Sequence, residues 1–108
     1  MKYLAKDIGK ILGIDQSLIP YPDFEIETIA TDTRTSNLPD STIFFALPGS
    51  INDGHDFIHE AILKGIKNFV VSQDIVGPKV KVNFFKVKNT LEALQKVAAY
   101  NRASFSDL

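Results

Sequence analysis

The chain has 108 residues, with 12 basic against 13 acidic side chains and a formal net charge of −1. This length predicts one small domain, and a hydrophobic fraction of 44% is enough for a buried core. The absence of cysteine excludes disulfides and Cys-based zinc sites, and the balanced charge excludes a broad cationic surface for nucleic acid.

The sequence signals of secretion, membrane insertion and phosphate binding are missing as well. The first residues, Met1–Asp7, contain an early acid and no long apolar core, and no apolar run approaches the roughly 20 residues of a membrane span. Neither G-x-x-x-x-G-K-[ST] nor G-x-G-x-x-G occurs, so the usual backbone cradle for nucleotide phosphates is lacking. We therefore expect a cytoplasmic protein without a nucleotide-phosphate loop in this chain.

The first half of the chain predicts a helix, a loop and two strands. Apolar residues follow helical spacing over residues 3–12, and Gly13 suits a helix C-terminal cap. Residues 14–24 contain two prolines and are typical of a loop. Residues 25–31 have β-rich composition, and the continuous apolar run at 42–47 predicts a buried strand.

The second half predicts two helices and two strands. A helix is expected over residues 55–64, with Asp53 as its N-cap, and strands are expected at 68–72 and 80–87. Asn89 opens a capping box for a final helix. The buried stripe of that helix is predicted as Leu91, Leu94, Val97 and Ala98. The element order predicts an α/β fold: a single small domain with a mostly buried mixed sheet flanked by helices.

A pair of histidines is the first candidate for chemistry. His55 and His59 are four residues apart on a predicted helix, which is the spacing of H-E-x-x-H zinc sites. However, Asp56 stands where the glutamate belongs, and no third ligand is evident nearby. The simpler interpretation is that His55 contacts the preceding loop and His59 is solvated.

Two polar segments at the ends of predicted strands are the other candidates. Thr31-Asp32-Thr33-Arg34 follows one strand, where ligands of α/β sheets bind, although local turn hydrogen bonds explain it equally well. The loop Gly49–Gly54 joins a buried strand to a helix start, which allows close backbone approach to a polar ligand. A plain β–α connection is the simpler explanation of that loop.

Taken together, these segments resemble the N-terminal domain of the Mur ligase family. The resemblance is strongest over about residues 25–72. The matching residues are Thr31-Asp32-Thr33-Arg34, Pro39, Ile43–Leu47, Gly49, Asp53–Ile58, Ala61, Gly65 and Phe69–Val71. Asp40-Ser41 departs from the Gly-Asp that is usual in the family.

The resemblance implies that residues 1–108 are the N-terminal substrate-binding domain of a three-domain ligase of peptidoglycan synthesis. Such enzymes use ATP and Mg²⁺ to extend a UDP-N-acetylmuramoyl-peptide, and the central ATPase and C-terminal domains would be absent from this chain. No catalytic residue, cofactor or metal is then expected within residues 1–108. Thr-Asp-Thr-Arg is most similar to the MurF type, which adds D-alanyl-D-alanine, including forms fused to an alanine racemase. A MurE-type domain and a stand-alone α/β binding module are the alternatives.

The resemblance also assigns the binding of UDP to particular residues. Thr33 matches the Ser or Thr whose hydroxyl lies near the uridine. Gly49 shapes the loop in which Ser50, Ile51 and Asn52 line the uracil and ribose. The supporting residues are Asp32, Arg34, Asp53, Gly54 and His55.

Overall fold

The computed structural model describes residues 2–31, 39–48, 54–75 and 81–106. Its principal sheet has the strand order β3-β4-β5-β6, and all three pairings are parallel. These strands are Thr28–Ala30, Thr42–Phe45, Asn68–Val71 and Asn83–Lys86. A separate antiparallel pair joins β1 (Tyr3–Leu4) to β2 (Glu25–Ile26). The predicted α/β class is confirmed. The parallel and antiparallel pairings expected within one mixed sheet lie in two separate sheets.

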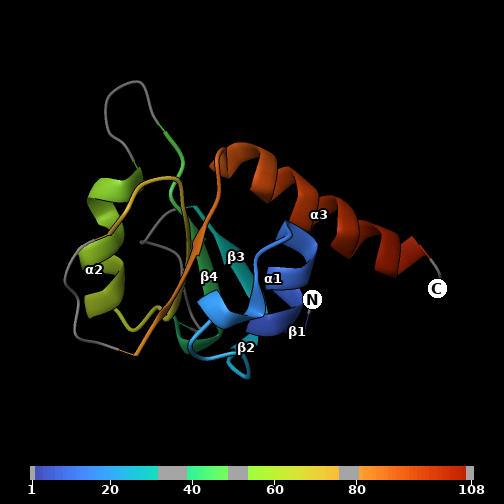
Figure 1. Ribbon diagram of the computed structural model, residues 1–108, viewed down its shortest axis with the longest axis horizontal. Helices are drawn as coiled ribbons and strands as arrows, with labels where there is room; N and C mark the ends of the chain where they lie inside the picture. Colours follow the sequence, from blue (N-terminus) through green and yellow to red (C-terminus); the bar gives the residue numbers. More distant parts are fainter. Residues whose placement is uncertain (1, 32–38, 49–53, 76–80, 107–108) are drawn as a thin grey trace.

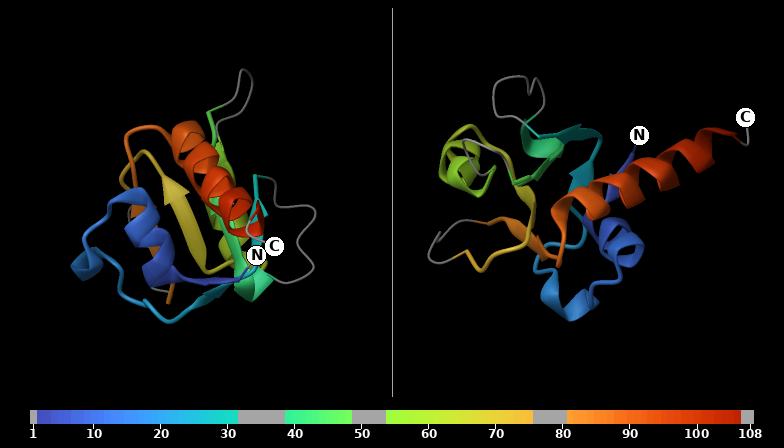
Figure 2. Two further views of the ribbon diagram at one scale, coloured as in Figure 1. Left: turned by 90° about the vertical axis from the view of Figure 1, so that its right-hand side faces the viewer. Right: turned by 90° about the horizontal axis from the view of Figure 1, so that it is seen from above.

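The α-helices cover both faces of the four-stranded sheet (Figure 1). On one face lies α2 (Ile58–Leu63), which the 3₁₀ turn η3 (Gly54–Phe57) precedes. On the other face lie α1 (Ala5–Leu12) and α3 (Thr90–Ser106), and the C-terminal half of α3 extends beyond the sheet (Figure 2). Two further 3₁₀ turns are η1 (Gln16–Leu18) and η2 (Pro39–Ser41).

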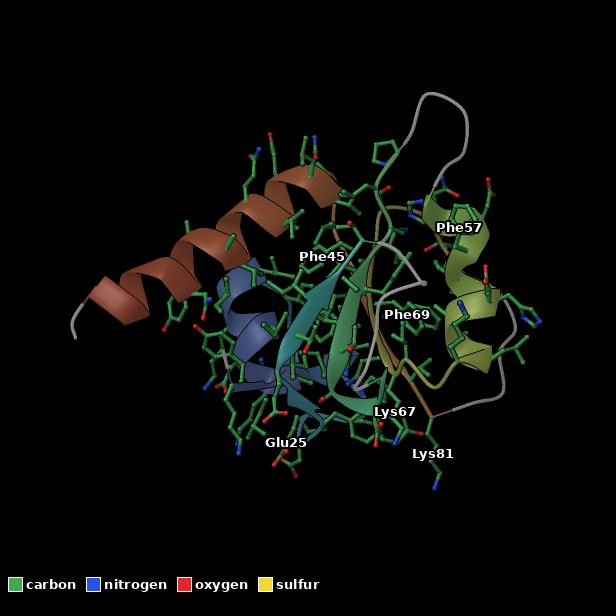
Figure 3. The ribbon with its side chains drawn as sticks, turned by 180° about the vertical axis from the view of Figure 1, so that it is seen from behind. Glu25, Phe45, Phe57, Lys67, Phe69 and Lys81 are labelled. Atoms are coloured by element: carbon green, nitrogen blue, oxygen red, sulfur yellow. The ribbon has the colours of Figure 1, made fainter. Side chains whose placement is uncertain are left out.

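The strands alternate their side chains between two cores. On β4, Phe45 packs in the core beneath α1 and α3, whereas Phe44 packs in the core beneath α2. On β5, Val70 packs in the core beneath α1 and α3, and Phe69 packs in the core beneath α2. Figure 3 shows Phe45 and Phe69 on opposite sides of the sheet. Every residue of β4 and β5 is buried, because helices cover both faces of these strands. The buried strand predicted over residues 42–47 is therefore confirmed, and it ends at Phe45.

The structure corrects two predicted boundaries in the N-terminal third. The helix predicted over residues 3–12 begins at Ala5, because the two residues before it pair with β2. It ends as predicted, with Gly13 in the left-handed conformation at φ 72°. The strand predicted over residues 25–31 divides at Glu27, because its first part pairs with β1 and its second part pairs with β4.

The predicted loop at 14–24 contains one regular turn. Asp15 precedes η1, and its carboxylate accepts the backbone N–H of Ser17 at 2.9 Å. This bond to the backbone N–H holds the pKa of Asp15 below its usual range.

The later helices also differ in part from prediction. The helix expected at 55–64 opens with the 3₁₀ turn η3, so α2 begins only at Ile58, and the predicted N-cap Asp53 lies outside the described residues. Asn89 caps α3 as predicted, since its Oδ1 accepts the Glu92 N–H at 3.0 Å.

The buried stripe predicted for α3 is wrong at one position. Leu91 is 48% exposed, whereas Thr90, Ala93 and Val97 are buried. Residues at spacings of three and seven share one helix face, so the buried face runs through Thr90 rather than Leu91. Leu94 and Ala98 lie half-buried at its margin.

A buried amide pair ties the segment after η1 to the sheet. Asn83 Nδ2 donates to Asn68 Oδ1 at 2.9 Å and to the Tyr21 carbonyl at 2.8 Å. Asn83 Oδ1 accepts the Tyr21 N–H at 2.9 Å. Both asparagines are fully buried, and within the described ranges Asn68 Nδ2 has no hydrogen-bond partner. Asn83 therefore supplies side-chain partners for both backbone groups of Tyr21.

Replacing Asn83 by leucine is expected to lower the free energy of unfolding by about 2–3 kcal/mol, since it leaves buried polar groups without partners. Urea denaturation of the purified chain measures this loss. Gln95→Leu, at an exposed amide on α3, is the matched control and should change stability by no more than about 0.5 kcal/mol. A loss below about 1 kcal/mol for Asn83→Leu would contradict the importance of the amide pair.

Candidate functional site

The carboxyl ends of the four parallel strands lie along one edge of the sheet. Ala30, the last residue of β3, pairs with Phe44 of β4, and Phe45 at the end of β4 pairs with Val70 of β5. In α/β sheets, ligands bind in the crevice outside this edge. The chain therefore leaves β3 and β4 at adjacent positions, next to where a ligand is expected.

The two predicted binding segments follow these two strands in the sequence. Thr31, directly after β3, and Pro48, shortly after β4, are both exposed. The predicted site residues that lie outside the described residues are Asp32, Thr33, Arg34, Gly49, Ser50, Ile51, Asn52 and Asp53. The topology thus brings the described ends Thr31 and Pro48 to the same edge of the sheet, and the roles of the residues between the described ranges stay predictions.

Gly54 closes the connection that leads from β4 to η3. Its N–H donates to the Leu47 carbonyl at 2.7 Å. A Cβ atom on Gly54 would lie 2.6 Å from the Leu47 nitrogen and 2.8 Å from the Leu47 oxygen. Because backbone atoms cannot move away as a flexible side chain can, only glycine fits here without displacing the chain.

His55 joins the start of η3 to the end of β5. Its Nε2 accepts the backbone N–H of Ser72 at 3.0 Å, and the bond is partly buried. An imidazole nitrogen that accepts a hydrogen bond carries no proton, so this contact requires neutral His55 with its proton on Nδ1. Sequence reasoning missed the role of Ser72, because no local pattern connects residues 17 positions apart.

The metal-binding alternative finds no support in the described ranges. His55 Nε2 is engaged by Ser72, and His59 is exposed, as predicted for a solvated residue. Among the residues that the structure describes, no group of three or more His, Cys, Asp or Glu side chains could hold a metal ion.

Charged side chains also lie along the carboxyl edge. Lys86, at the end of β6, pairs with Asp74 at 2.6 Å. Both side chains are largely exposed, so the pair contributes little stability. An open groove of about 440 Å³ lies at the start of α3, where Lys88, Asn89 and Lys96 are among its lining residues.

In the described part of the chain, no helix has the length and apolar character needed to cross a membrane.

Comparison with known proteins places this fold in a family. The family model described as "Mur ligase family, catalytic domain" matches residues 25–102. The UDP-N-acetylmuramoyl-tripeptide–D-alanyl-D-alanine ligase of Rickettsia prowazekii is 44% identical over 94% of this chain and 21% of its own length. The UDP-N-acetylmuramoyl-L-alanyl-D-glutamate–2,6-diaminopimelate ligase of Clostridium tetani is 41% identical over 73% of this chain and 16% of its own.

Solved structures agree on the fold. A crystal structure of MurF from Acinetobacter baumannii superposes with a TM-score of 0.76 at 23% identity, over 100% of this chain and 22% of that one. The chain thus spans about a fifth of the length of these proteins. Since the family model matches well over half of its residues, the chain belongs to the Mur ligase family.

Proposed function

We propose that this chain is the domain that binds the UDP part of a UDP-N-acetylmuramoyl-tripeptide in a cytoplasmic, ATP-dependent ligase of the MurF type. The complete enzyme would add D-alanyl-D-alanine to that precursor in peptidoglycan synthesis. The observation that carries the proposal is the adjacency of the β3 and β4 carboxyl ends in a member of this family. The Rickettsia prowazekii relative, whose name states this reaction, matches nearly the whole chain.

The proposed contacts with UDP come from the two segments at this edge. The Thr33 hydroxyl would form a hydrogen bond near the uridine. The loop that Gly49 shapes would place Ser50, Ile51 and Asn52 along the uracil and ribose. Asp32, Arg34, Asp53, Gly54 and His55 would support these contacts. A net charge of −1 gives no broad basic field, so local amides and hydroxyls would hold the diphosphate.

The ATP and Mg²⁺ of such a ligase do not fit the residues of this chain. The sequence has no G-x-x-x-x-G-K-[ST] loop, and the described ranges hold no cluster of metal ligands. We therefore assign the phosphoryl chemistry to a central domain beyond residue 108. This chain would contribute binding energy distant from the reacting carboxylate, which orients that carboxylate and reduces the entropy lost in the transition state.

The Thr33 hydroxyl is expected to contribute measurably to this binding. Thr33→Val keeps the side-chain shape but removes the hydroxyl, so the Kd for UDP-N-acetylmuramoyl-tripeptide should rise by about threefold to tenfold in calorimetry. Thr28→Val, at the opposite end of β3, is the matched control and should leave the Kd unchanged. An unaltered Kd for Thr33→Val would remove this residue from the site, and no binding by the parent chain would count against the function itself.

A MurE-type ligase is the second candidate, because the Clostridium tetani relative, named for addition of 2,6-diaminopimelate, is 41% identical. The coding sequence beyond Leu108 and an assay of the full-length product separate the candidates. Ligation of D-alanyl-D-alanine to the tripeptide supports the MurF type, and ligation of diaminopimelate to the dipeptide supports the MurE type. A stop codon directly after Leu108 would instead favour a stand-alone binding module.

A further inference from the structure

The connection from β4 to η3 is held at both of its described ends. Before the connection leaves the sheet, the Ala46 N–H donates to the Val70 carbonyl at 3.0 Å, which continues the pairing of β4 with β5. Where it returns, the Gly54 N–H donates to the Leu47 carbonyl at 2.7 Å. These bonds between backbone groups bring the two ends together, and a side-chain substitution removes neither of them directly.

His55 adds a bond of a different kind. It is the second residue of η3, and its Nε2 accepts the N–H of Ser72, the first residue after β5. The returning end of the connection is thereby fastened to the residue that directly follows β5, and the departing end is held by Val70 within that strand. Because this bond uses a side chain, a single substitution can remove it while the backbone stays unchanged.

We infer that His55 is a positioning residue of the nucleotide site, which acts by accepting the Ser72 N–H rather than by touching the ligand. The inference rests on the proposed function, since the residues proposed to contact the uracil and ribose lie between the two fastened ends. Without the bond, the returning end would sample more conformations. Ligand binding would then have to order that end, and the affinity would fall by the corresponding amount.

Two substitutions separate the acceptor from the bulk of the side chain. His55→Leu fills similar space but cannot accept a hydrogen bond, whereas His55→Gln places an amide oxygen near the position of Nε2. His59→Leu is the matched control, because His59 is an exposed histidine four residues further along. All variants are prepared in the full chain, and their free energies of unfolding are measured in urea to confirm that each one folds.

The test has two readouts. The first is the Kd for UDP-N-acetylmuramoyl-tripeptide, which should rise by about threefold to tenfold in His55→Leu and return close to the parent value in His55→Gln. The second is amide hydrogen exchange by NMR without ligand. The Ser72 amide should exchange several-fold faster in His55→Leu, while the amides of β4 and β5 keep their protection. His59→Leu should change neither readout.

The two readouts distinguish failure of the inference from failure of the proposed function. Unchanged Ser72 exchange in His55→Leu overturns the inference whatever the affinity. Faster exchange with an unchanged Kd, or an equal loss of affinity in His55→Gln and His55→Leu, overturns the positioning role. If the parent chain binds no UDP-sugar at all, the proposed function fails and the positioning role with it, and the exchange rates then show whether the His55 bond exists.

Discussion

Replacing Phe45 by alanine should lower the free energy of unfolding by about 3–5 kcal/mol, the largest effect expected from any single substitution considered for this chain. Phe45 is fully buried on β4 and packs with α1, α3 and the neighbouring strands. The loss combines the transfer free energy of the ring with the cavity that remains, which rigid strands on either side cannot close. Domains of this size have total stabilities of about 5–15 kcal/mol, so a large share would disappear.

Urea denaturation followed by circular dichroism measures this loss. Phe57→Ala is the matched control, because Phe57 on η3 is 38% exposed and should lose about 1 kcal/mol or less. Phe69→Ala removes an equally buried ring from the core on the α2 face, and a similar loss is expected there. If Phe45→Ala and Phe57→Ala destabilised the chain equally, the assignment of Phe45 to the core would be wrong.

Replacing Gly54 by alanine is also expected to have a large effect, and to act on stability and binding together. The new Cβ would lie under 3.0 Å from three backbone atoms of Ala46 and Leu47. The chain must shift to relieve this overlap, and the bond from the Gly54 N–H to the Leu47 carbonyl would be distorted. We expect the free energy of unfolding to fall by about 2–4 kcal/mol and the Kd for the UDP-sugar to rise by about tenfold or more.

Gly13→Ala is the matched control for this prediction. A Cβ on Gly13 would meet nothing within 4 Å, but the positive φ of 72° strains any other residue. Its cost should be about 1–2 kcal/mol, with no change in affinity, because Gly13 caps α1 and is not among the residues proposed to bind UDP. Equal effects of the two glycine substitutions on nucleotide binding would contradict a special role for Gly54.

Features that depend on neighbouring residues were predicted well. The continuous apolar run at 42–47 identified β4, since a strand covered on both faces needs apolar side chains in both directions. Gly13 and Asn89 marked a helix end and a helix start, because capping is set by one or two adjacent residues. The family was also recognisable, because its motifs combine several short local patterns in a fixed order.

Features that depend on distant pairing were not predictable in the same way. Strands of two residues, such as β1 and β2, are too short to show an alternating pattern. The division of residues 25–31 at Glu27 arises because two different partners take the two halves. For α3, the periodic pattern indicated an amphipathic helix, but only contact with the sheet decided that the face runs through Thr90 and not Leu91.

For the candidate site too, some features followed from the sequence and others only from the tertiary structure. By itself, the sequence determined the fold class and the family, and it singled out the two polar segments that follow β3 and β4. Only the tertiary structure decided that these strands are parallel neighbours, so that the described ends Thr31 and Pro48 lie at one edge. It also showed that His55, which the sequence left as a metal ligand or a contact of the preceding loop, accepts a hydrogen bond from the backbone after β5. The physical reason is that a side chain's function depends on the atom it faces, and for His55 that atom is the Ser72 nitrogen, 17 residues away.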